Sequence, residues 1–108
     1  MSYEVLQFVA LTSGGQAFDI EFPLHPQTQS VPAVSGLVTR LLEVISEHTR
    51  DRDDVSDGDI LQALAMTSAI RGRMLEGDQQ QIADLNRLLH EQAWQAVSTA
   101  NSYAAARA

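Results

Sequence analysis

Residues 17–24, AFDIEFPL, alternate between apolar and polar side chains, and this pattern decides the fold class. Every second residue from Phe18 to Leu24 is apolar, while Asp19 and Glu21 occupy positions between them. A period of two is typical of a β-strand with one buried face, whereas most of the remaining chain has the spacing of helices. The chain is therefore predicted to be α+β rather than all-helical.

The segment before this strand predicts its partner. Residues 3–11, YEVLQFVAL, are rich in β-branched and aromatic side chains, and the intervening TSGGQ has two glycines for the positive φ values of a tight turn. We expect a β-hairpin over about residues 3–24. An isolated hairpin is marginally stable in water, so these strands should lie on the helices, pair with a second copy, or both.

Three helices are expected after the hairpin. The first spans residues 31–49, because Ser30 can cap it and apolar residues then recur at helical spacing. The second spans residues 57–75 and is apolar on nearly every side, which predicts a central helix buried by its neighbours. The third spans residues 79–104, after a left-handed stop at Gly77. A hairpin followed by three helices, the middle one central, forms a single domain over residues 1–108.

The acidic stretch DRDDVSDGDI, residues 51–60, resembles a calcium loop at first sight. With its glycine at position 6 of an EF-hand, Asp53 and Asp57 would match ligand positions 1 and 5, but Val55 and Leu64 would occupy positions 3 and 12. Hydrocarbon side chains cannot coordinate a hard cation. An EF-hand is therefore rejected, and weak adventitious cation binding is the remaining alternative.

Helix capping explains the same stretch better. Ser56 is expected to be the N-cap of the second helix, and Asp59, three residues on, can complete a capping box rather than bind a metal. Asp57 would favour the positive end of the helix dipole.

Composition disfavours several classes of function. The 108 residues carry a formal net charge of −7, with no lysine and no clustered arginines, so nucleic-acid binding is not expected. The absence of cysteine excludes disulfides, thiolate metal sites and a cysteine nucleophile. No apolar stretch approaches the ~18 residues of a membrane span, and the N-terminus lacks the form of a secretory signal. We expect no membrane association and a cytoplasmic location.

The histidines and serines predict no catalytic or metal site. His25, His48 and His90 are dispersed, and none has a second histidine three or four residues away. The serines have no recognisable nucleophile motif. No cofactor, metal or catalytic residue is therefore assigned.

Arg71, Gly72 and Arg73 raise a separate question, because Gly72 lowers helix propensity by about 1 kcal/mol relative to alanine. Close approach of the third helix is one explanation, and a small anion held by the two arginines is the other. Side chains two positions apart diverge by about 200° on a helix, which favours close approach.

Trp94 is the most informative residue of the third helix. Helical spacing places it on the polar side, with His90 one turn before it, Arg87 nearby and Asn101 on the same polar side. A tryptophan flanked by arginine is typical of protein interfaces, so these four residues are predicted to bind a partner. The alternative is that the hairpin or the proline-rich loop covers the indole within the same chain.

These observations predict a small acidic protein-interaction or assembly module that binds a second copy of itself or another protein. The alternative is a small enzyme or ligand-binding domain, with a site formed by Arg87, His90, Glu91 and Trp94.

Overall fold

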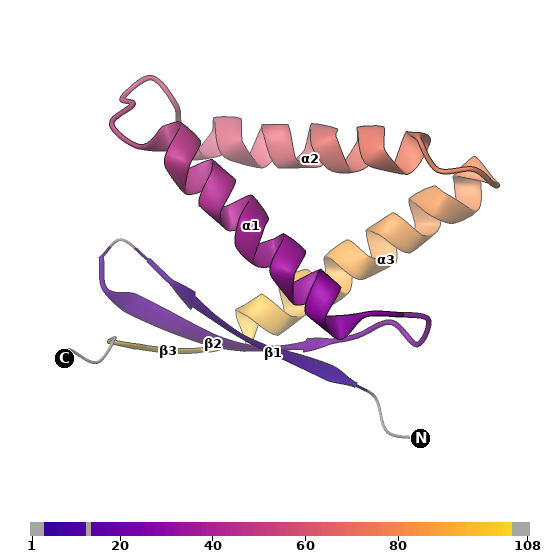
Figure 1. Ribbon diagram of the computed structural model, residues 1–108, viewed down its shortest axis with the longest axis horizontal. Coiled ribbons are helices and arrows are strands. Elements are labelled where there is room, and N and C mark those ends of the chain that lie inside the picture. Colours follow the sequence, from indigo (N-terminus) through magenta and orange to yellow (C-terminus); the bar gives the residue numbers. More distant parts are fainter. Residues whose placement is uncertain (1–3, 13, 105–108) are drawn as a thin grey trace. The chain divides into compact units, whose positions relative to one another are not determined.

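The computed structural model describes residues 4–12 and 14–104 and confirms the α+β fold, a β-hairpin followed by three helices (Figure 1). The elements are β1 (Val5–Leu11), β2 (Gln16–Pro23), α1 (Val31–Thr49), α2 (Asp57–Arg73), α3 (Gln79–Ser98) and β3 (Asn101–Ala104). The expectations for Tyr3 and Ser13 lie outside the described residues. The chain divides into two compact units, Met1–Ser35 with Arg87–Ala108 (unit 1) and Gly36–Asn86 (unit 2). The single domain expected over residues 1–108 stays a prediction.

The hairpin forms as predicted in unit 1. β1 and β2 pair antiparallel, with Phe8 opposite Ile20 and Leu6 opposite Phe22, so the apolar residues of both strands share one face. The turn is closed by the backbone N–H of Thr12, which donates to the carbonyl of Gln16 at 2.8 Å. Of the two turn glycines, Gly15 adopts the positive φ that was expected, at 86°.

The end of the chain differs from the prediction. The helix expected to reach residue 104 ends at Ser98, and Asn101–Ala104 forms a third strand antiparallel to β2, with Tyr103 opposite Ala17. The hydroxyl of Thr99 donates to helix carbonyls of the preceding turn, which competes with continuation of the helix. The free edge of β2 then supplies a ladder of hydrogen bonds, and this tertiary pairing overrides the helix propensity of the alanine-rich segment.

The third strand pairs with the second edge of β2. β2 is the central strand of a sheet ordered β1-β2-β3, so its second edge is paired within its own chain. Of the alternatives expected for the strands, pairing with a second copy is therefore not open to β2, whereas β1 is an edge strand of this sheet. The buried apolar residues among the described residues all lie in unit 1: Leu6, Ala17, Ile20 and Ala96.

Helices α1 and α2 begin where the sequence predicts. The side chain of Ser30 accepts a hydrogen bond from the N–H of Ala33 at the start of α1. Ser56 and Asp59 form the predicted capping box of α2, each side chain accepting from the other's backbone N–H at 3.1 Å. The capping interpretation of the acidic stretch is thereby confirmed.

The sequence predicts that several neighbours bury α2, but within one chain they do not. No residue of α2 is buried, and its large apolar side chains, Leu61, Leu64, Met66 and Ile70, are all exposed. α1 also has no buried residue. Within unit 2, residues 36–49 of α1 and α2 diverge from the connector that joins them (Figure 1). The helical unit therefore lacks a buried core of its own.

Candidate functional site

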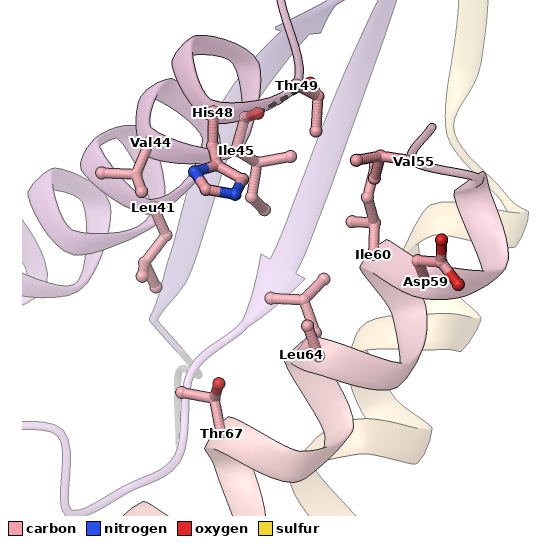
Figure 2. Close-up of a pocket in the computed structure, with 11 residues that line it drawn as sticks. Leu41, Val44, Ile45, His48, Thr49, Val55, Asp59, Ile60, Leu64 and Thr67 are labelled. Carbon is pink, nitrogen blue, oxygen red and sulfur yellow. Dashed lines mark hydrogen bonds between the residues drawn. The ribbon is translucent and has the colours of Figure 1, made fainter. Parts of the chain in front are cut away.

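An apolar groove of about 390 Å³ lies between α1 and α2 within unit 2 (Figure 2). Its hydrocarbon walls come from the C-terminal half of α1, the connector and the N-terminal half of α2: Leu41, Val44, Ile45, Val55, Ile60, Ala63 and Leu64. His48, Thr49, Asp59 and Thr67 supply its polar groups. A lining dominated by aliphatic side chains suits apolar contact with another molecule rather than acid–base chemistry.

The sequence builds this groove from one stripe on each helix. On α1, Leu41, Val44, Ile45 and His48 recur at intervals of three and four residues and therefore share a side. Thr49 is the last residue of α1 and lines the groove. Its hydroxyl donates a hydrogen bond of 2.8 Å to the carbonyl of Ile45, shown as a dashed line in Figure 2. Thr49 and the connector residue Val55 line the groove where α1 ends.

The connector is ordered by a two-point ion pair. Nε and Nη2 of Arg52 donate to the two carboxylate oxygens of Asp54 at 3.2 and 3.0 Å. These hydrogen bonds, together with one from the backbone N–H of Asp54 itself, hold the pKa of the Asp54 carboxyl below its ordinary value. The charged residues of the connector thus serve its local conformation.

The polar groups of the groove do not form a recognisable catalytic arrangement. The nearest side-chain partner of His48 is Arg52, with Nη1 at 3.4 Å from Nε2, and one oxygen of Asp59 is occupied by the capping box. Val55 and Leu64, which would be EF-hand ligands, both place hydrocarbon against the groove. Across residues 4–12 and 14–104, no group of three or more acidic or histidine side chains is placed to hold a metal ion.

Trp94, predicted from the sequence to be a contact residue, lies in unit 1 and is 61% exposed. The hairpin and the proline-rich loop do not cover the indole, so that alternative is not met. His90 and Arg87 are also exposed and lie one and two turns before Trp94 on α3. Asn101 belongs to β3 rather than to the helix, so its predicted place on this helical side is wrong.

Other sequence-predicted groups have simple structural roles or none. His25 lies in a turn, where its Nδ1 accepts a hydrogen bond from the N–H of Gln27. The groove is lined by residues of unit 2 alone, and Glu91 belongs to unit 1. A ligand or catalytic site at Arg87, His90, Glu91 and Trp94 stays a prediction.

The groove itself was missed by sequence reasoning, which assigned its lining residues to a core. The signal that could have found it is the apolar character of α2 on nearly every side. Two neighbouring helices cannot bury a helix that has apolar side chains on nearly every side. Such an excess of apolar side chains predicts a surface that is completed by another molecule.

Comparisons of the chain with family models, curated proteins and solved structures gave no match. No helix in the described part of the chain is long and apolar enough to cross a membrane.

Proposed function

We propose that this protein is a small assembly module that functions as a homo-oligomer. The observation that carries the proposal is the state of unit 2, whose helices bear many large apolar side chains and no buried residue. Large apolar side chains left exposed in such numbers are characteristic of surfaces that bind other proteins. Association would give these helices the core that they lack in one chain.

The partner in this proposal is another copy of the chain rather than a nucleic acid or a membrane. The net charge of −7 opposes binding to phosphate backbones, and the exposed helices are apolar without a basic stripe. A different acceptor protein is the competing partner. The cytoplasmic location expected from the sequence forms part of the proposal and can be checked by cell fractionation.

Sedimentation equilibrium of the purified full-length chain tests the proposal directly. We expect a mass that is a multiple of 11.8 kDa at micromolar concentration and a thermal unfolding midpoint that rises with protein concentration. A folded chain that stays monomeric at every concentration would overturn self-association. If the monomeric chain instead forms a defined complex with a different protein, the competing proposal of a different acceptor protein would be supported.

A further inference from the structure

One side of α2 carries a seam of five exposed residues, which we call the α2 outer face: Asp59, Gln62, Met66, Ile70 and Arg73. Successive members are three, four, four and three residues apart, so they follow a single line along the helix. Met66 is 57% exposed and Ile70 is 55% exposed. Intervals of three and four residues are typical of the side chains through which one helix packs along another.

The centre of the α2 outer face, Met66, lies away from the contacts of Leu64 and Ser68 within unit 2, whereas Asp59 at its N-terminal end also lines the groove. Leu64, two residues before Met66, lines the groove with α1. Ser68, two residues after Met66, donates a hydrogen bond to Asn86 of α3. A separation of two residues corresponds to about 200° around a helix, so Met66 lies nearly opposite both contacts.

The charges of the α2 outer face are complementary to those of the same face on a second, antiparallel copy of α2. Asp59 lies in the first turn of α2 and Arg73 in the last turn, each seven residues from Met66. The described residues provide no ion pair for Arg73. An antiparallel copy of the helix would place Asp59 opposite Arg73 and Met66 opposite Met66. A parallel copy would place like charges opposite each other, which is unfavourable.

We propose that a second copy of this chain docks on the α2 outer face, with α2 antiparallel to α2 and a twofold axis passing beside Met66. This inference rests on the proposed homo-oligomeric function and specifies its surface. A twofold interface is formed by the same surface patch on both copies, and the symmetric placement of Asp59 and Arg73 about Met66 satisfies this requirement. The two ion pairs are then about 21 Å apart along the helix and flank a central contact formed by Met66 and Ile70.

Disulfide trapping tests the position of the axis, because the chain contains no cysteine. In full-length Met66→Cys, oxidation is expected to give a covalent dimer rapidly, since the two sulfurs would meet across the axis. Gln62→Cys alone should not cross-link, because its two copies would be separated by about 12 Å along the helices, beyond the reach of a disulfide. A mixture of Gln62→Cys and Ile70→Cys should give the heterodimer, because these positions face each other.

The matched control is Thr39→Cys, at an exposed site on α1. Met66→Cys is also oxidised in denaturant, which measures cross-linking by random collision. If the wild type is oligomeric and Met66→Cys cross-links no faster than Thr39→Cys, the inference is overturned while the proposed function stands. If the wild type is monomeric, the proposed function itself is overturned.

A charge reversal provides a second test that does not depend on cysteine chemistry. Arg73→Glu places two repulsive contacts at the proposed interface and should raise the dissociation constant about tenfold. Arg50→Glu changes the net charge equally but lies in the connector, outside the α2 outer face. Equal dissociation constants for the two variants would contradict the antiparallel pairing.

Discussion

Oγ of Ser68 donates a hydrogen bond of 3.1 Å to Oδ1 of Asn86, which joins the middle of α2 to the first half of α3. Both residues are half-buried. Within unit 2, this bond fixes which side of α2 is directed toward α3. The α2 outer face of the proposed interface lies on a different side of the helix.

We expect Ser68→Ala to lower the free energy of unfolding by about 1 kcal/mol, because the side-chain oxygen Oδ1 of Asn86 loses its donor at a half-buried position. Ser46→Ala is a matched control, since Ser46 is an exposed residue inside α1 and the same change alters helix propensity equally. Urea unfolding of both variants measures the difference. Equal stability of the two variants would show that the bond contributes nothing.

Gly72 supports a second prediction about the contact between α2 and α3. A Cβ at Gly72 would lie 3.5 Å from Cγ2 of Ile82, an ordinary van der Waals distance. The third helix therefore approaches Gly72, as expected from the sequence, but it leaves room for a methyl group. Gly72→Ala should raise the free energy of unfolding by up to about 1 kcal/mol through helix propensity alone.

Gly36→Ala is the control for this variant, because a Cβ there would meet nothing within 4 Å and Gly36 also lies inside a helix. Thermal unfolding followed by circular dichroism compares the two. A Gly72→Ala chain that is less stable than the wild type would show that the helices pack more closely than the 3.5 Å contact implies.

The local features of the fold could be predicted because they depend on neighbouring residues. The alternation from Phe18 to Phe22 and the capping pair Ser56 and Asp59 are satisfied within a few positions of the chain. The strand Asn101–Ala104 could not be predicted in this way. Its pairing with β2 joins residues more than 80 positions apart, and its own composition favours a helix.

The site was predictable only in part, for a related reason. The sequence places Trp94 on the polar side of the third helix but leaves open whether the same chain covers it, and the 61% exposure of the indole decides that question. The groove and the α2 outer face require knowledge of which sides of α2 meet α1 and α3. A helix that is apolar on nearly every side gives no periodic signal for that choice.

The ion pair of the connector predicts a pH dependence. Because Arg52 holds the pKa of Asp54 below its ordinary value, Asp54 favours the folded connector above the pKa of the unfolded chain. This contribution is lost as the pH falls through the folded-state pKa. Arg52→Gln should raise the pKa of Asp54 toward its ordinary value, as measured by the carboxyl ¹³C shift in an NMR titration. Arg50→Gln, which alters a nearby arginine, should leave it in place, and an equal shift in both variants would contradict the direct pairing.

Trp94 is the single tryptophan of the chain, so its fluorescence reports one site. At 61% exposure the indole should emit as a solvated tryptophan in dilute protein, and the emission should shift to the blue as the protein associates if Trp94 is a contact residue.

Trp94→Ala should then weaken association by about 2 kcal/mol, the effect expected of an aromatic residue at the centre of an interface. Gln95→Ala, at the next exposed position of α3, provides the control. An oligomer whose Trp94 emission stays solvent-like at every concentration would place the indole outside the interface. The proposed contact through the α2 outer face would not be affected by this result, because all of its residues lie on α2 and Trp94 lies on α3.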